Sequence, residues 1–318
     1  MISRVSIGGA VAAAIALFLV LAPLHRPDAH AEAPSDVRTV CTGDLTGRLC
    51  MLMRCAGPTC TPTSPQTASA PTAQIDWRPL DPDNTLLIDT TAGRIVVEMR
   101  PDLAPQAVAR IKLLSREHVY DGLLFHRVID HFVDQTGNPN NKDGGASNHP
   151  DLEPEFDARI APAAVTPIAH PAGGVLGFMG STPVQASTHL GADGKARTWG
   201  LYCAGVAGMG RQAGENTANS EIFLMRDPAR RLDHSYTVWG RAVAGLDVVR
   251  AIKIGFPPKG PDKMLSVRVM ADLPAAERPH IEVLSERGPA FAALLARLQQ
   301  TKGADFSPCD IDLPTRVH

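Results

Sequence analysis

Two runs rich in aliphatic and β-branched residues, 85–90 and 94–99, flank the short polar stretch Thr91-Ala92-Gly93. Glycine suits the strained position of a tight turn, so this pattern predicts a β-hairpin. Residues 104–118 instead repeat apolar side chains every three to four positions, which predicts an amphipathic helix. Pro105 is compatible with that helix because it falls in the first turn.

The runs that follow are short and separated by Gly and Pro, which favours an antiparallel barrel over a βαβ array. A second helix over 246–253 and a strand over 264–270 complete the pattern. The excess residues around 181–199 are expected to form an elaborated surface loop. Residues 287–300 have helical periodicity, and we expect this helix to pack on the barrel rather than to bind a partner.

The segment 124–135 combines a guanidinium, aromatic rings and an amide within two short apolar runs. Residues i and i+2 of an extended chain point the same way, so Phe125 and Arg127 are expected to share a face. After a bend, the second run carries Phe132 and Gln135. The pattern therefore predicts a cation, a ring and an amide close together.

The composition excludes several partner classes. The chain has 318 residues, 44% of them apolar, and a formal net charge of −2. This is enough chain for one large core with extensions or for two small domains. No dense cluster of Lys and Arg occurs, so neither nucleic acid nor an anionic membrane surface is expected as a partner.

The first residues have the features of a secretory signal peptide. Arg4 precedes an apolar run over 7–24, and Ala29-His30-Ala31 fits a small-x-small cleavage site. We therefore predict a signal peptide at 1–31 and an exported, periplasmic or secreted protein. The alternative is an uncleaved membrane anchor, because the run approaches the ~20 residues that a spanning helix needs. A membrane contact is expected through this segment alone.

Four cysteines crowd a short segment at 32–60, and two more follow far downstream, at Cys203 and Cys309. A segment with little core gains stability from disulfides, which persist in oxidising compartments. The four allow three pairings, and the alternative of a zinc site lacks the usual Cys-x-x-Cys spacing. Residues 61–82, rich in Pro, Ser and Thr, are expected to be a linker. The crowded cysteines are Cys41, Cys50, Cys55 and Cys60.

Four ordered blocks between Thr85 and Met270 resemble the cyclophilins, which are barrel-shaped peptidyl-prolyl cis/trans isomerases. The resemblance implies a mainly β fold: a closed eight-stranded antiparallel barrel capped by two α-helices, over residues 83–272. The N-terminal Cys-rich segment and a C-terminal helical extension at 273–318 lie outside it. The blocks are Phe-His-Arg-Val-Ile (125–129) with Phe132 and Gln135, Gly-Val-Ala-Gly-Met-Gly-Arg (205–211), Asn-Ser-Glu-Ile-Phe-Leu (219–224) and Leu-Asp-His-Ser-Tyr-Thr-Val-Trp-Gly-Arg-Ala-Val (232–243).

The resemblance also implies a site. Arg127 would be the catalytic residue, acting without covalent chemistry at the prolyl amide, and no cofactor or metal is expected. Glu221 stands where the family has Gln, and Arg231 where strong cyclosporin binders have Trp, so strong inhibitor binding is not expected. The residues expected to bind a proline-containing polypeptide are Phe132, Gln135, Met209, Glu221, Phe223, Leu232 and Tyr236.

Three functional readings remain open at this point. The first is an isomerase that assists the folding of exported proteins. The second is a proline-binding chaperone or scaffold with weak or no isomerase activity, suggested by Glu221 and the Cys-rich extension. The third is a structural barrel in which Arg127 and Gln135 diverge. Since amide rotation needs no proton shuttle, a hydrogen-bonding role is favoured for His126 over a catalytic one.

Overall fold

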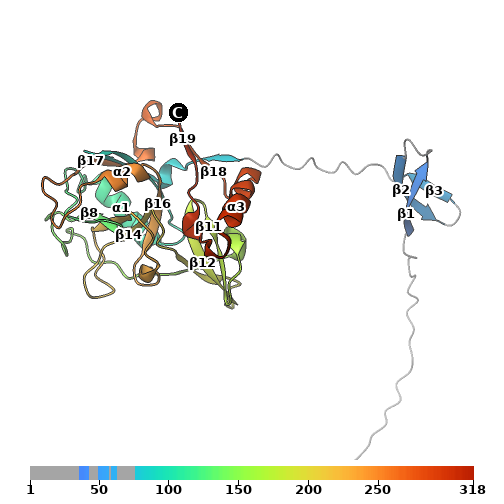
Figure 1. Ribbon diagram of the computed structural model, residues 1–318, viewed down its shortest axis with the longest axis horizontal. Helices are drawn as coiled ribbons and strands as arrows, with labels where there is room; N and C mark the ends of the chain where they lie inside the picture. The colour runs from blue at the N-terminus through green and yellow to red at the C-terminus, as the bar shows by residue number, and fades with distance from the viewer. Residues whose placement is uncertain (1–35, 43–48, 57–58, 63–75) are drawn as a thin grey trace, which may run out of the picture. The chain divides into compact units, whose positions relative to one another are not determined.

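The structure is a computed structural model that describes residues 36–42, 49–56, 59–62 and 76–318. The chain divides into two compact units, Met1–Ala70 and Pro71–His318 (Figure 1). The expected leader at 1–31 and the central part of the expected linker lie outside the described residues. No helix of the described part is long and apolar enough to cross a bilayer.

The described part of the first unit is a three-stranded antiparallel sheet in the order β1-β2-β3. Its backbone register makes Cys41 the partner of Cys50, and Cys55 the partner of Cys60. The side chains of this unit lie outside the described structure, so the pairing of the four cysteines stays open. The strands are β1 (Asp36–Thr42), β2 (Leu49–Ala56) and β3 (Thr59–Pro62).

An eight-stranded sheet forms the centre of the second unit, in the order β17-β5-β6-β16-β14-β15-β8-β7 with antiparallel neighbours. The first hairpin turns at Gly93, whose φ of 137° is a conformation that L side chains rarely adopt. Its strands are β5 (Thr85–Thr90), β6 (Gly93–Met99), β7 (Arg127–Ile129), β8 (Val133–Thr136), β14 (Val206–Met209), β15 (Ile222–Met225), β16 (Val238–Ala244) and β17 (Met264–Val269).

This sheet is a curled half-barrel, so the expectation of a closed barrel is wrong. The edge strands β7 and β17 do not form a ladder with each other. Instead, isolated bridges and single backbone hydrogen bonds link the segments beside these strands, as between Val128 of β7 and Gly255 and between Leu124 and Lys263. The segment between α2 and β17 runs beside β7 but pairs with it at one residue only. Its prolines, such as Pro257 and Pro258, lack the amide donors that a continuous ladder needs.

Two helices pack on the sheet (Figure 1): α1 (Pro105–Arg116) and α2 (Leu246–Ala251). The predicted helix at 104–118 is confirmed in α1, which begins at Pro105. Its apolar stripe, including Ile111 and Leu114, joins residues of β5, β6 and β17 in one buried core. The predicted second helix ends two residues earlier than expected, at Ala251.

The expected surface loop around 181–199 is instead part of a five-stranded antiparallel sheet. Alternate side chains of its strands, such as Val184 and Ala186, are buried in a small core with Met179 and Ile160. A segment with a buried apolar face of this kind is a folded element rather than a loop. The sheet has the order β10-β11-β12-β13-β9, with β9 (Ala158–Ile160), β10 (Thr166–Ala169), β11 (Gly174–Met179), β12 (Thr182–Leu190) and β13 (Ala196–Gly200).

Residues after 273 form a third layer of the second unit with the segment that precedes β5. Strand β18 (Ile281–Leu284) lies between β19 (Thr315–Val317) and β4 (Trp77–Pro79). Helix α3 (Pro289–Lys302) lies beside β11 and β18 (Figure 1), and Phe291 meets Phe178 of β11 edge to face at 5.9 Å. The 3₁₀ turns are Pro82–Asn84, Pro162–Ala164, Arg230–Leu232, Met270–Asp272, Ala275–Glu277, Gly303–Asp305 and Pro308–Asp310.

A disulfide joins this layer to the central sheet. Cys203 precedes β14, and Cys309 follows α3, with 4.9 Å between their Cα atoms. Both cysteines pack in the apolar cluster that also contains Tyr202 and Phe223. The two cysteines that the sequence left apart are therefore partners.

Candidate functional site

A tight hairpin between β7 and β8 places Arg127 opposite Gln135. The chain reverses at His131, whose φ of 54° lies in the left-handed region. Because direct register partners carry their side chains on the same face, the guanidinium and the amide meet. Arg127 Nη1 donates to Gln135 Oε1 at 2.8 Å. The reading in which these two residues diverge therefore does not describe this protein.

Phe125 does not share the face of Arg127. It is fully buried in the core between the sheet and α1, whereas Arg127 is half-buried at the surface. The expected alternation fails because the regular strand β7 begins only at Arg127. A side chain placed before the strand begins does not follow its period.

The guanidinium lies at one end of a groove of about 500 Å³. Seven of the eight expected site residues line it, and the exception is Met209, which is buried in the core beneath the sheet. Arg211 and Gln212 also line the groove and were not anticipated. The full lining is Arg127, Phe132, Val133, Gln135, Asp143, Gly144, Gly210, Arg211, Gln212, Glu221, Phe223, Leu232 and Tyr236.

One part of the groove is apolar and aromatic. The Phe223 ring stacks on Tyr202 at 5.7 Å and meets Tyr236 edge to face at 5.9 Å. Gly208 makes room for this ring, because a Cβ there would lie 2.3 Å from Phe223 Cζ. Together with Phe132 and Leu232, these rings form a slot that suits an apolar ring without a hydrogen-bond donor.

Two further arginines lie over this aromatic slot. The guanidinium of Arg231 lies 4.4 Å from the centre of the Phe132 ring, and that of Arg211 lies 4.5 Å from the centre of the Tyr236 ring. Arg211 is held in place because it donates to Ser235 O through Nη2 at 2.9 Å. The rim of the groove is consequently more basic than the sequence motifs alone suggest.

The polar part of the groove is a chain of hydrogen bonds. Gln135 Nε2 donates to Glu221 Oε1, while Gln135 Oε1 accepts from Arg127. Glu221 is 4% exposed, and its second oxygen accepts from Gly144 N at 3.3 Å. Within residues 76–318 no ion pair joins Glu221 to Arg127, so the carboxylate acts on the guanidinium through the Gln135 amide. Gln135 is the only hydrogen-bond acceptor for Arg127 in this part of the chain, and the guanidinium also lies 5.6 Å from the centre of the Phe256 ring, so its other donors have no protein acceptor there.

His126 differs from the expectation of a hydrogen-bonding role. Its imidazole is buried, and neither ring nitrogen has a hydrogen-bond partner in the described structure. Its Nε2 lies 3.3 Å from Asp143 Oδ1 and 3.4 Å from Glu221 Oε2. These three residues are one of two groups in the described part of the chain that bring His and carboxylate atoms close enough to hold a cation.

A buried ion pair supports the hairpin from behind. Arg226 Nη1 donates to Asp134 Oδ1 at 2.9 Å, and the same guanidinium donates to the carbonyl oxygens of Val249, Arg250 and Ile252. Burial raises the pKa of Asp134 to about 7, against the opposing effect of Arg226. The pair connects β8 and the end of β15 to the last turn of α2, which fixes the strand that carries Gln135.

Comparison with known proteins identifies the family. Residues 85–270 match the model of the cyclophilin type peptidyl-prolyl cis-trans isomerase family. The chain belongs to this family. A crystal structure of the cyclophilin AquaCyp293 from Hirschia baltica is similar with a TM-score of 0.70 and 33% identity, covering 76% of this chain and 93% of that one.

Two relatives with curated descriptions support the assignment of this chain to the cyclophilin family. A probable peptidyl-prolyl cis-trans isomerase of Brucella suis is 33% identical over 65% of this chain and 88% of its own length. The peptidyl-prolyl cis-trans isomerase ppi1 of Schizosaccharomyces pombe is 29% identical over 51% of this chain and 81% of its own. The match to the Hirschia protein covers 76% of this chain, which is more than the share that residues 85–270 represent.

Proposed function

We propose that this cyclophilin isomerises X-Pro bonds of exported polypeptides, with Arg127 as the catalytic residue. The proposal rests on one observation, namely that Arg127 lines the same groove as the aromatic slot and uses only one hydrogen bond to the protein in the described structure. Proline fits such a slot because its ring is apolar and its nitrogen carries no hydrogen.

The chemistry requires no nucleophile. Rotation about a peptide bond meets a barrier of ~18–20 kcal/mol, because the nitrogen lone pair is delocalised into the carbonyl group. A site lowers this barrier when it binds the twisted amide more tightly than either planar form. Arg127 has a permanent charge and rigidly arranged donors, so it stabilises the lone pair as it localises on the prolyl nitrogen.

The remaining residues of the groove position the substrate and the guanidinium. Phe132, Phe223, Leu232 and Tyr236 hold the prolyl ring and lower the local dielectric constant around Arg127. The Gln135 amide fixes the guanidinium through the 2.8 Å hydrogen bond, and Glu221 fixes the amide from the other side. Gln135 therefore contributes by orientation, which reduces the reorganisation needed during the reaction.

Two features support export as the setting. The first 31 residues have the pattern of a cleavable leader. The disulfide between Cys203 and Cys309 suits an oxidising compartment, because such bonds rarely persist in the cytosol. Newly exported chains containing proline would be the substrates, since slow X-Pro isomerisation limits folding.

The decisive experiment compares Arg127→Ala with the parent chain in an assay of proline tetrapeptide isomerisation. Loss of a preorganised charge of this kind costs roughly 10²–10³-fold in rate, and we expect a loss of this size in kcat/KM. Arg127→Lys should recover only part of it, because an ammonium group lacks the planar donor arrangement. Arg116→Ala is the matched control, since Arg116 pairs with Asp272 at the surface and lies outside the groove.

Equal rates for Arg127→Ala and the parent would contradict the catalytic role. Binding of a proline peptide by the parent chain, without acceleration of isomerisation, would instead support the alternative of a proline-binding chaperone or scaffold. The hydrogen bond between Gln135 and Glu221 would favour the chaperone or scaffold only if it kept the Arg127 guanidinium away from the substrate. A titration of the peptide followed by intrinsic fluorescence, together with the rate assay, separates the two outcomes.

A further inference from the structure

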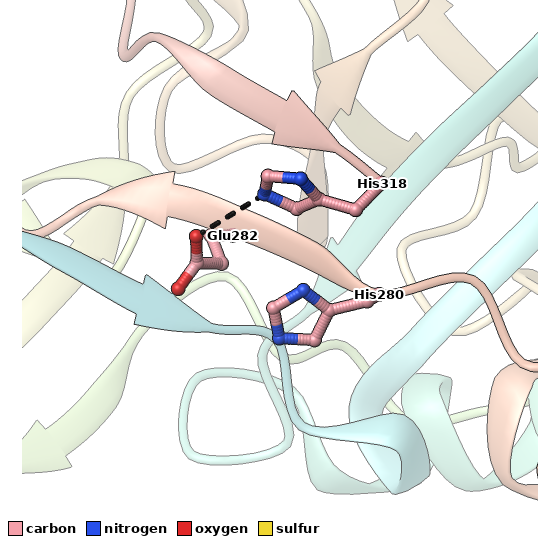
Figure 2. Close-up of side chains that lie close together, drawn as sticks. All are labelled: His280, Glu282 and His318. Carbon is pink, nitrogen blue, oxygen red and sulfur yellow. Dashed lines mark ion pairs between the residues drawn. The ribbon is translucent and has the colours of Figure 1, made fainter.

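A second group of metal-binding side chains lies on the layer that carries the C-terminal strands. His318 N donates to His280 O at 2.9 Å, and Ile281 pairs with Val317 in the antiparallel ladder of β18 and β19. This hydrogen bond continues the register of the ladder by one residue, to His280 just before β18 and His318 just after β19, so both imidazoles lie on the face that carries Glu282. Figure 2 shows the two imidazoles and the carboxylate gathered there.

One distance within this group matches that between two ligands of a metal ion, and the others are near it. His318 Nε2 lies 3.4 Å from Glu282 Oε2, and the imidazole centres of His280 and His318 are 5.2 Å apart. One ligand atom from each residue lies within 4.8 Å of the others. Two ligands at ~2.0–2.1 Å from a tetrahedral Zn²⁺ are about 3.3–3.4 Å apart. One edge therefore already has the required length, and a rotation of the exposed His280 side chain completes the set.

These three side chains have little else to bind. Within residues 76–318 the imidazole of His280 has no hydrogen bond or ion pair, and the carboxylate of Glu282 pairs only with His318. Arg316 is the register partner of Glu282 and the obvious competitor for its charge. Its guanidinium lies instead 3.6 Å from the centre of the Trp77 ring, where it stacks on the aromatic face. The carboxylate is thus available to a cation.

We propose that His280, Glu282 and His318 form a binding site for a borderline divalent cation, with Zn²⁺ as the best match. Two imidazoles and one carboxylate are a common zinc ligand set that leaves a fourth position for water. Mg²⁺ and Ca²⁺ prefer shells made only of oxygen and are a poor match. Since Glu282 lies on β18, His280 directly precedes that strand and His318 directly follows β19, the ion links the two strands at this end of the ladder.

The site is separate from the groove, because none of its three residues lines it. Its effect is on the C-terminal layer, where β18 and α3 contribute to a shared core with β4 and β11. An ion that binds only the folded state stabilises it by mass action. The proposal therefore concerns stability of this layer and stands independently of the isomerase activity.

The test is a Zn²⁺ titration of the full, untagged chain by isothermal calorimetry, beside His280→Ala, His318→Ala and Glu282→Gln. We expect each variant to lose about tenfold or more in affinity for the Zn²⁺ that the parent binds here. His189→Ala is the matched control, since His189 is an exposed histidine on β12. Zn²⁺ should raise the Tm of the parent and of the control more than that of the three variants, and Mg²⁺ should raise none.

Zn²⁺ binding that is identical in the parent and all three variants would overturn the proposal. Such a result would assign the ion to another group, for example His126, Asp143 and Glu221. A measurement on the parent chain avoids any loss of folding in a variant: the imidazole NMR signals of His280 and His318 should shift together on addition of Zn²⁺. Unchanged signals for these two residues would likewise overturn it.

Discussion

The orientation of one amide connects two opposite charges in the groove. Gln135 presents its oxygen to Arg127 and its nitrogen to Glu221, so the carboxylate selects one of the two amide orientations. The glutamine that the family pattern has in place of Glu221 would be able to donate or accept and would not impose this choice. The acidic residue therefore adds positional order and, at the same time, a negative charge near the Arg127 guanidinium.

Glu221→Gln separates these two effects. We expect kcat/KM for a proline peptide to rise up to about fivefold, which corresponds to about 1 kcal/mol, because the anion no longer offsets the field of Arg127. The measurement is the tetrapeptide assay at fixed ionic strength. Glu117→Gln is the control, since Glu117 is an exposed carboxylate paired with His149. A fall of tenfold or more would show instead that the charged acceptor of Gln135 matters more than the field.

The family resemblance identified the residues of the hairpin, and the register of β7 and β8 brings Arg127 and Gln135 together. The two-residue period placed Phe125 on the face of Arg127, which is wrong, and the resemblance placed Met209 in the site, although it is buried in the core. Both faces of β14 are apolar: Ala207 and Met209 face the main core, and Val206 packs in the cluster beside the groove. Since an apolar pattern cannot tell one buried face from another, the burial of Met209 became visible only in three dimensions.

At the scale of elements, one buried carboxylate joins three segments that are distant in sequence. Glu98 of β6 forms a paired interaction with Arg78 of β4 at 2.7 and 2.8 Å. It also accepts from Ser181 N, in the turn between β11 and β12, at 2.9 Å. Burial alone would raise the pKa of Glu98, but the hydrogen bonds and charge of Arg78 outweigh it and lower the pKa.

This contact predicts an acid-sensitive contribution to stability. Because the pKa of Glu98 is lower in the folded state, its contribution is present above the usual glutamate range near ~4.3 and is lost as the pH falls through and below that value. Glu98→Gln should therefore reduce the free energy of unfolding at pH 7 by about 1.5–3 kcal/mol. Between pH 7 and pH 3, the free energy of unfolding should also fall less in this variant than in the parent chain. Urea unfolding at several pH values measures both quantities.

Asp272→Asn is the matched control for Glu98, since Asp272 forms an exposed pair with Arg116. Exposed pairs contribute about 0–1 kcal/mol, so this variant should change stability little. An equal pH dependence for Glu98→Gln and the parent chain would contradict the assignment.

The same region shows what the sequence did not reveal about elements. The hairpin at Gly93 and the helix α1 have strong local patterns and were predicted nearly to the residue. The segment of β12 and β13 was expected to be a loop, because its apolar face is completed by neighbours such as Leu103 and Val165 rather than by a regular alternation of its own. The open edge between β7 and β17 was also missed, since the family pattern specifies strand order but not whether the last ladder closes.

At the scale of the whole second unit, the added layers depend on contacts between distant segments. Trp77 of β4 pairs with Leu284 of β18, and the shared core includes Phe178 and Phe291. The local sequence pattern does not identify such partners, because the apolar face of each strand is buried only by the other segments. The terminal helix that was expected to pack on the barrel is α3, which shares a core with β11 and β18 of the added layers and with Leu87 and Val96 of the central sheet.

Within residues 76–318, the disulfide is the one cross-link between the terminal layer and the cluster that contains Tyr202 and Phe223. Cys203 and Cys309 are 106 residues apart, and a cross-link across so long a loop restricts the unfolded chain strongly. We expect the double variant Cys203→Ser and Cys309→Ser to lose about 2–5 kcal/mol in the free energy of unfolding. The measurement is urea denaturation under oxidising conditions, where the remaining four cysteines are unchanged.

The effect of this double variant on catalysis should be smaller than its effect on stability. Both cysteines pack in the cluster that supports Phe223, yet Arg127 and Gln135 are held by the hairpin and by the Arg226 pair instead. We therefore expect kcat for the folded variant to stay within about threefold of the parent at low temperature, because a change of threefold is only about 0.7 kcal/mol. A collapse of kcat in a variant that remains folded by circular dichroism would show that the terminal layer also sets the geometry of the groove. Unchanged stability would instead show that packing around Phe178 and Phe291 suffices to hold that layer without the covalent link.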